Sequence, residues 1–430
     1  MVTTLFTGGD VLDRDGRRAA DVVIDDNSGL VVEVGRSLSA DRELSAEGCL
    51  ITPGFVDLHV HFRQPGYEIA ETIETGSRAA ALGGFTTVVT MPNTTPCTDS
   101  PAVVKEVLDY SSTALCRVQP SAAITVGQKG VELTPMAELL DLGVRMFTDD
   151  GTGVQDDQLM RRALEYAGKL PTADKRPVVL AQHCESAALS QGGVMHEGAW
   201  SSRLGLLGQP SSAEELMVMR DITLCRLTGT RVHLQHLSTA GSVALLRSAK
   251  DVGVPVTAEV TPHHFTLTDD ACSSYDPLFK VHPPLRSTSD IAAIREGLQD
   301  GTIDAIATDH APHTTDTKQQ PFDSAPPGVL GLETAFAVAN TELDLPMEKL
   351  LSLLSWQPAE IAGVEDSGLI APGSSADLAV IDPAFEWTVD QTKLASKASN
   401  TPFHGKQMTG KVRHTAFAGE VVVIDGKPSR

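Results

Sequence analysis

Eight apolar runs, each followed by a helix-like stretch, constrain the fold of this chain more than any other feature. Because the runs are almost continuously apolar, they are typical of parallel strands that are covered by helices on both faces. Eight such units can close on themselves, so we predict an α/β fold, a (β/α)8 barrel of the TIM type, rather than an open doubly wound sheet. The runs lie at residues 50–61, 85–91, 117–125, 144–148, 177–183, 231–236, 254–261 and 303–308.

The spacers and the two chain ends differ in pattern. Helical patterns fill the spacers at 71–82, 102–110, 135–142, 158–170, 212–227, 242–252 and 290–299, and two more follow at 333–341 and 347–362. Short strand-like runs occupy both ends, at 21–26, 30–34, 376–382, 413–418 and 420–424. We therefore predict that residues 1–52 and 365–430 form one small β-sandwich domain, and that residues 53–364 form the barrel.

Composition excludes several classes of protein. The 430 residues are 41% hydrophobic, enough for a large core, and the formal net charge is -22. Such an acidic chain is a poor nucleic-acid binder, although one arginine can still hold a small anion. We find no apolar window of about 18 residues, no signal-peptide pattern and no CxxC pair among the six cysteines. We expect a soluble cytoplasmic enzyme that binds neither nucleic acid nor membrane.

Polar side chains stand where the predicted strands end, which is where barrel enzymes carry their active sites. His59 and His61 are two residues apart, so they share one face of a strand and can bind one metal ion. Any one of these side chains alone could be structural, but their joint position indicates a metal centre. The candidates are His59, His61, Asp150, His183, His236 and Asp309.

The number and type of these candidates predict two ions. One catalytic zinc takes about three protein ligands, so six candidates exceed its need. Two ions that share a bridging carboxylate would use all six. Histidine and aspartate donors favour Zn²⁺, with Mn²⁺ or Co²⁺ as replacements. Strand alternation does not separate Asp149 from Asp150 as the ligand after the fourth strand.

These residues stand in phrases that resemble the metal-dependent amidohydrolase superfamily and, within it, the class I bacterial dihydroorotases. The resemblance spans nearly the whole chain. Its phrases are PGFVDLHVHFR (53–63), ETIETGSRAAALGGFTTVVTMPNT (71–94), MFTDDG (146–151), HCE (183–185), MHEG (195–198), AEVTPHH (258–264), ATDHAPH (307–313), GLETA (331–335) and SNTPF (399–403).

The resemblance implies the reversible cyclisation of N-carbamoyl-L-aspartate to (S)-dihydroorotate in pyrimidine (UMP) biosynthesis. It implies two zinc ions per subunit. His59 and His61, with Asp309 beside them, would bind the first ion; His183 and His236 would bind the second, and Asp150 would bridge the two. It also implies substrate contacts from Arg63, Asn93, His282, His313 and the loop at Pro327 and Gly328.

Elementary chemistry agrees with this assignment. Arg63 lies two residues beyond His61, so it shares the inward face and can bind a carboxylate with two parallel hydrogen bonds. A metal pair polarises an amide carbonyl and lowers the pKa of water to make hydroxide. Asp309 stands where it can accept the proton from that hydroxide and pass it to the leaving nitrogen, so we predict it as the catalytic residue.

Two alternatives stay open. One is a hydrolase of another cyclic amide, like hydantoinases, dihydropyrimidinases and allantoinases; these typically bridge their metals with a carboxylated lysine, and residues 145–150 contain no lysine. The other is a non-catalytic partner of aspartate transcarbamoylase, against which the complete ligand set argues. We expect a homo-oligomer, while zinc occupancy, association with aspartate transcarbamoylase and the order of loop 314–326 are left open.

One position departs from the family pattern. Class I dihydroorotases usually carry asparagine where this chain has His282, in the phrase HPPLR. That asparagine normally contacts the substrate. A neutral imidazole can still donate one hydrogen bond, so we interpret His282 as a substitute donor.

Overall fold

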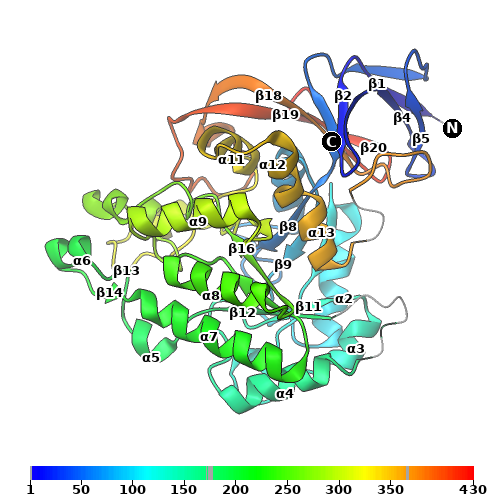
Figure 1. The fold of residues 1–430 in the computed structure, drawn as a ribbon. Helices are drawn as coiled ribbons and strands as arrows, with labels where there is room; N and C mark the ends of the chain where they lie inside the picture. The colour runs from blue at the N-terminus through cyan, green and yellow to red at the C-terminus, as the bar shows by residue number, and fades with distance from the viewer. Residues whose placement is uncertain (1, 171, 173–177, 365–367) are drawn as a thin grey trace.

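The computed structural model in Figure 1 describes residues 2–170, 172, 178–364 and 368–430. All eight predicted inner strands are present, although the predicted start of the fifth, residue 177, lies outside the described residues. They are β8 (Phe55–Val60), β9 (Phe85–Thr90), β10 (Arg117–Pro120), β11 (Met146–Thr148), β12 (Val179–His183), β15 (Val232–Gln235), β16 (Val256–Val260) and β17 (Ala305–Ile306).

Parallel pairing connects these strands in chain order. One sheet runs β10-β9-β8 and another runs β11-β12-β15-β16-β17. Parallel bridges between Ala122 and Phe147 and between Val60 and His310 join the two sheets at both ends. The carboxylate of Asp57 strengthens the second junction, because it accepts the backbone N–H of Thr308 at 3.0 Å. The carboxyl ends of all eight strands therefore face the same side.

Helices follow the strands as predicted, and the main ones are α1 (Ile73–Leu82), α2 (Pro101–Tyr110), α3 (Met136–Asp141), α4 (Asp157–Ala167), α7 (Ser211–Thr228), α8 (Ala240–Asp251), α9 (Thr288–Asp300) and α11 (Ala335–Glu342). Side-chain caps fix several of their starts; Asp156, for example, accepts the N–H of Leu159 at 2.7 Å. Figure 1 shows α4, α7, α8 and α9 side by side over the strands. The described short helices are α5 (Ala187–Ser190), α6 (Ala199–Leu204) and α10 (Thr315–Lys318), with 3-10 turns at Ser111–Thr113, Val126–Gln128, Asp269–Ser274, Pro277–Phe279 and Gln391–Lys393.

The prediction of one helix over 347–362 is wrong. The structure divides this segment into α12 (Met347–Leu354) and α13 (Trp356–Ala362). A proline at position 358 has no backbone N–H, and in a continuous helix its ring would collide with the carbonyl of Leu354. Ser355 breaks the helix there, and its hydroxyl donates to the carbonyls of Pro53 and Gly54 at 3.2 and 2.9 Å.

Two further sheets lie together beside the helices in Figure 1, one built from N-terminal strands alone and the other from strands of both chain ends. Their orders are β5-β4-β1-β6 and β21-β20-β19-β18-β7-β2-β3. Phe6, Val22, Leu378 and Val380 belong to one buried cluster shared by these sheets. The strands are β1 (Thr3–Thr7), β2 (Asp10–Asp13), β3 (Gly16–Ala19), β4 (Asp21–Asp25), β5 (Leu30–Gly35), β6 (Arg42–Ser45), β7 (Leu50–Pro53), β18 (Leu378–Thr388), β19 (Gln407–Phe417), β20 (Glu420–Ile424) and β21 (Lys427–Pro428).

Two short strands form a small sheet of their own. The short strands β13 (Met195–His196) and β14 (Gly208–Gln209) pair with each other between α5 and α7. No helix among the described residues is long and apolar enough to span a membrane. The predicted domain boundary at 364–365 meets residues 365–367, which lie outside the described residues.

Candidate active site

A cavity of about 200 Å³ lies at the carboxyl ends of the inner strands. Every side chain or backbone segment predicted for the site lines it except His59, which lies beneath its floor with no exposed surface. The sequence prediction did not include two further lining residues, Gly151 and Ala311. The full lining is His61, Arg63, Asn93, Asp150, Gly151, His183, His236, His282, Asp309, Ala311, His313, Pro327 and Gly328.

Asp150 lies among four imidazoles. Its Oδ1 atom is 3.3 Å from Nε2 of His59, 3.6 Å from Nδ1 of His183 and 3.6 Å from Nε2 of His236. Its Oδ2 atom is 3.5 Å from Nε2 of His61. Two groups of side chains, His59–His61–Asp150 and Asp150–His183–His236, are each compact enough to hold one cation. Asp150 belongs to both groups, which is the position of a carboxylate shared by two ions.

The neighbouring Asp149 has a different environment. Its carboxylate accepts the backbone N–H groups of Ile124 and Thr125 at 2.8 and 3.0 Å, and also the Thr125 hydroxyl. Asp149 therefore ties β11 to the segment after β10, while Asp150 faces the cavity. Strand alternation did not separate the two aspartates; of the two, Asp150 lines the cavity, and it is also the one that the family resemblance selects.

The donor atoms fit bound metal ions. Nε2 of His59 is buried and has no hydrogen-bond partner among the described residues, and it faces the carboxylates of Asp150 and Asp309. Nδ1 of His183 and Nε2 of His236 lie 3.0 Å apart. Ring nitrogens and carboxylates that converge in this way, away from solvent, form a donor set typical of Zn²⁺.

Asp309 completes the donor set. Its Oδ1 atom is 3.0 Å from Nε2 of His61 and 3.7 Å from Nε2 of His59. Burial raises the pKa of Asp309, but the hydrogen bond from His61 and the neighbouring imidazoles outweigh burial and hold it well below its usual value. Asp309 adopts φ 47°, in the left-handed region that only glycine occupies readily. Such strain in a non-glycine residue is common at functional sites.

A buried hydrogen-bond chain behind His59 was missed by the sequence analysis. Glu259 on β16 accepts Nδ1–H of His59 at 2.9 Å, and its other oxygen lies 3.1 Å from Nε2 of His233. His233 in turn contacts the Thr257 hydroxyl at 2.9 Å. Carboxylates of this kind fix which nitrogen of a histidine faces a metal. A charged residue inside an otherwise apolar strand was the available signal.

Asn93, predicted to contact the substrate, also orients a ligand candidate. Its Oδ1 atom accepts Nδ1–H of His61 at 3.0 Å, and its amide nitrogen lies 3.4 Å from Oδ2 of Asp150. Nε2 of His61 is therefore directed at the carboxylates. Asn93 lines the cavity as well, so it contacts both the donor set and the space that a substrate would occupy.

Arg63 and His313 form the opposite wall. Arg63 Nε–H donates to the carbonyl of Pro312 at 3.2 Å, and its Nη2 atom lies 3.4 Å from His313. His313 Nε2–H donates to the carbonyl of Pro327 at 2.8 Å. Burial first, and the Arg63 charge second, lower the pKa of His313 to about 3, so its ring is neutral at pH 7. Gly328 adopts φ 129°, and a Cβ there would meet Ala311 at 2.7 Å.

His282 contacts protein groups through both ring nitrogens. Nε2 lies 2.8 Å from Oε2 of Glu185, and Nδ1 lies 3.4 Å from Nε2 of Gln209. The ring stacks on His183, with the centroids 5.0 Å apart and the planes at 13°. His282 lines the cavity as predicted, but in this arrangement it presents ring surface to the cavity rather than a free N–H.

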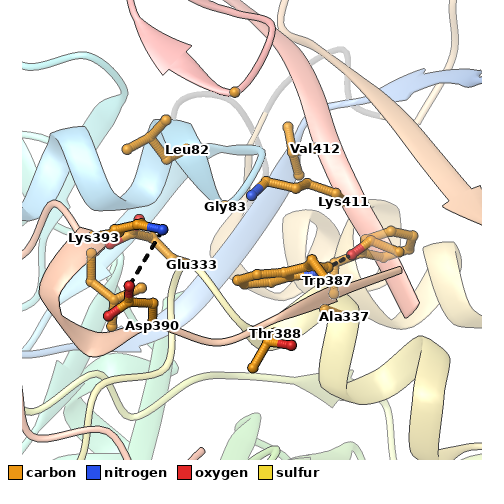
Figure 2. A pocket seen from close by; sticks show the side chains of 14 residues that line it. Leu82, Gly83, Glu333, Ala337, Trp387, Thr388, Asp390, Lys393, Lys411 and Val412 are labelled. Carbon is orange, nitrogen blue, oxygen red and sulfur yellow. Dashed lines mark hydrogen bonds and ion pairs between the residues drawn. The ribbon is translucent and has the colours of Figure 1, made fainter. Parts of the chain in front are cut away.

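A second cavity, of about 280 Å³, is lined by other residues, from α1, α11, β18 and β19 (Figure 2). Trp387 Nε1–H donates to the carbonyl of Gly410 at 2.9 Å, and the Lys411 ammonium lies 4.3 Å from the Trp387 ring centre. Lys393 pairs with Asp390 at 3.4 Å. None of the residues predicted for the site lines this cavity, and its lysines have partners in the walls.

Comparison with known proteins shows the broad class of protein to which the chain belongs. Residues 233–423 match the family model described as the amidohydrolase family. The fold is similar to an L-hydantoinase (dihydropyrimidinase) from Arthrobacter aurescens, with a TM-score of 0.88 and 25% identity over 100% of this chain and 98% of that one. A dihydropyrimidinase from Brevibacillus agri has a TM-score of 0.86 at 21% identity over 99% and 96%. The fold and the family match thus place the chain in the amidohydrolase class.

The sequence comparisons narrow this class. Residues 48–242 match the family model described as dihydro-orotase-like. Dihydroorotases from Pelotomaculum thermopropionicum and Anaeromyxobacter dehalogenans are each 48% identical to the chain. The first match covers 98% of both chains, and the second covers 100% of both. The chain therefore belongs to the dihydroorotase family, as its sequence phrases predicted.

Proposed function

We propose that this chain interconverts N-carbamoyl-L-aspartate and (S)-dihydroorotate in a zinc-dependent reaction. One observation carries the proposal: the Arg63 guanidinium lines the same small cavity as Asp150 and the imidazoles around it. Arginine is suited to two parallel hydrogen bonds with a carboxylate, which both compounds possess. The cluster of histidines and aspartates beside it is suited to chemistry on an amide. The dihydroorotases that share 43–48% identity with the chain support this assignment.

We also propose the finer architecture. The pairing of eight parallel strands and the bridge back to β8 support a (β/α)8 barrel over residues 53–364. The cluster shared by the two terminal sheets supports a β-sandwich domain over residues 1–52 and 365–430. A homo-oligomer and an association with aspartate transcarbamoylase remain predictions from the resemblance.

The donor set divides between two zinc ions. His59, His61 and Asp309 would hold one ion, His183 and His236 the other, and Asp150 would contact both. When bound, zinc supplies a Lewis acid for the amide carbonyl and lowers the pKa of water to give a nucleophile near neutral pH. Glu259 and Asn93 hold His59 and His61 with Nε2 directed at the site.

The other residues act on the substrate and its protons. Arg63 would bind the substrate carboxylate, with the neutral His313 ring beside it. In the hydrolytic direction Asp309 accepts a proton from the attacking water and donates it to the ring nitrogen as the amide C–N bond breaks. In the cyclising direction the same carboxylate takes the proton from the carbamoyl nitrogen as the C–N bond forms, and it donates that proton to the carboxyl oxygen that leaves as water. Pro327 and Gly328 line one side of the cavity.

The test is a turnover assay on the zinc-loaded protein with four separate substrates: dihydroorotate, N-carbamoyl-L-aspartate, dihydrouracil and hydantoin. We expect metal-dependent turnover of the first two only, loss of turnover in a chelated sample, and loss in Asp309→Ala. Activity on hydantoin or dihydrouracil alone would favour a different cyclic amidase, which the structural similarity to hydantoinases makes the second candidate. No turnover of any of the four substrates would favour a non-catalytic partner of aspartate transcarbamoylase.

A further inference from the structure

Glu185 has a position that neither the sequence prediction nor the proposed function uses. It lies two residues after His183, with a side chain that is 17% exposed. One carboxylate oxygen accepts the Ser190 hydroxyl at 2.6 Å. The other lies 2.8 Å from Nε2 of His282 and 3.9 Å from Nε2 of His183. The carboxylate therefore lies beside the Nε2 atoms of two imidazoles that stack on each other.

The hydrogen-bond partners indicate which nitrogen of each ring carries the proton. Gln209 directs its amide N–H at Nδ1 of His282, so the proton of a neutral His282 ring is on Nε2, the atom that faces Glu185. In His183, Nδ1 belongs to the group that would hold zinc with Asp150 and His236, so a ring that binds the ion through Nδ1 carries its proton on Nε2. That Nε2 atom is buried without a hydrogen-bond partner among the described residues, and Glu185 is the carboxylate that faces it. Both rings thus present N–H groups to one acceptor.

We propose that Glu185 is a positioning residue that couples the metal ligand His183 to the substrate wall formed by His282. The negative charge of its carboxylate favours a proton on Nε2 of His183, which leaves Nδ1 free toward Asp150. Its hydrogen bond with His282 keeps that ring stacked on His183 as one wall of the cavity. His282 then shapes the cavity through its ring, and its N–H is used by Glu185 rather than by the substrate. This inference rests on the proposed function, and it identifies Glu185 as a residue that determines how the substrate fits the cavity.

The same three side chains could instead bind a cation, because His183, Glu185 and His282 also form a compact group. The Gln209 contact argues against this, since a metal would need the lone pair of His282 Nε2 and would place the proton opposite an amide donor. Zinc stoichiometry separates the two readings.

The experiment compares the parent enzyme with Glu185→Gln, His282→Asn and the double variant. Glu197→Gln is the matched control, because Glu197 is an exposed glutamate in the neighbouring segment. Zinc affinity is measured by competition with a chromophoric chelator, and total zinc by elemental analysis. KM and kcat for dihydroorotate are measured in excess zinc.

We expect Glu185→Gln to bind the same number of zinc ions as the parent, with the weaker ion bound about 10- to 100-fold less tightly. In excess zinc its kcat should recover to within about threefold, while KM rises about tenfold because the wall loses its anchor. His282→Asn should raise KM without changing zinc affinity. The double variant should show no larger KM than the worse single variant, because both act through one contact.

Three results would overturn the proposal: unchanged zinc affinity and KM in Glu185→Gln, independent effects on KM in the double variant, or an extra zinc ion in the parent that Glu185→Gln loses. If Glu185→Gln does not fold, Glu185→Asp keeps the charge and moves it back by one methylene, and the same measurements apply. Zinc binding is measured without substrate. A parent enzyme that fails to turn over dihydroorotate would therefore refute the proposed function and still leave the zinc affinities to test the role of Glu185.

Discussion

Oε1 of Glu259 lies 2.9 Å from Nδ1 of His59, and neither side chain has exposed surface. Because His59 donates from Nδ1, the lone pair of Nε2 is free and faces Asp150 and Asp309. The two residues are 200 positions apart in sequence, so the positions of the strands β8 and β16 decide this contact.

This relationship predicts a graded loss of metal affinity. Glu259→Gln keeps one acceptor but removes the charge, and we expect zinc to bind about 10- to 100-fold less tightly. Thr257→Val removes only the hydroxyl beyond His233 and should have a much smaller effect. Chelator competition measures both, and equal affinities in the parent and Glu259→Gln would contradict the assignment.

The two adjacent aspartates should respond differently to the same change. Asp150→Asn should bind fewer zinc ions than the parent and lose turnover by at least about a thousandfold, because the bridging charge is lost. Asp149→Asn should keep the zinc stoichiometry. It should instead lower the free energy of unfolding by about 2 kcal/mol, because hydrogen bonds to a charged acceptor are weakened. Elemental analysis and urea unfolding distinguish the two, and zinc loss in Asp149→Asn would be the contrary outcome.

Arg63 should act on the substrate carboxylate alone. We expect Arg63→Lys to raise KM for dihydroorotate about tenfold, because lysine cannot form the paired hydrogen bonds. Arg63→Met removes the charge and should raise KM about a hundredfold or more. Zinc affinity should not change in either variant. Similar KM values in the parent and Arg63→Met would show that the carboxylate binds elsewhere.

Lys318 should make stability depend on pH. It is 6% exposed, and its ammonium donates to the carbonyls of Pro326 and Gly328, both at 3.1 Å. Burial first, and the charge of Lys280 second, lower its pKa from 10.5 to about 7. Between pH 7 and 10.5 the unfolded chain binds more protons than the folded one at this position. The free energy of unfolding therefore rises with pH across this range, by up to about 1.4 kcal/mol per unit.

The variant Lys318→Met isolates this contribution. Below pH 7 both states of the parent are protonated at Lys318, so the folded state carries the full cost of a buried ammonium. The stability difference between Lys318→Met and the parent should shift in favour of the parent as the pH rises from 7 to 9. Urea unfolding of both proteins in the presence of a chelator, at pH 7, 8 and 9, measures this difference in the free energy of unfolding. A pH-independent difference would show that Lys318 keeps an ordinary pKa.

Most of the inner architecture was predictable from local pattern. Short apolar runs that alternate with helical patterns indicate buried parallel strands, and the eight predicted runs all contain strands. The break at Ser355 was missed because the apolar periodicity continues through it, although Pro358 was a visible signal. In the terminal segments, β1, β2, β3, β6 and β21 were missed because short strands carry too few residues to show a period.

The site residues also fall into those that the sequence predicted and those that it missed. Strand register and the family resemblance together named the residues that line the cavity, except Gly151 and Ala311. The sequence analysis did not find Glu259 or the second role of Asn93, and it assigned His282 a free donor. Each of these depends on a hydrogen bond between residues at least 32 positions apart.

By itself, the sequence determined the eight β/α units, the side chains at the strand ends and the family, because these depend on periodicity and on residue identity. Only the tertiary structure decided that Asp149 accepts hydrogen bonds from Ile124 and Thr125, that Glu259 selects the tautomer of His59, and that Glu185 uses the N–H of His282. The physical reason is that a proton's position on an imidazole is set by whichever donor or acceptor lies within about 3 Å, and the folded backbone alone brings those partners together.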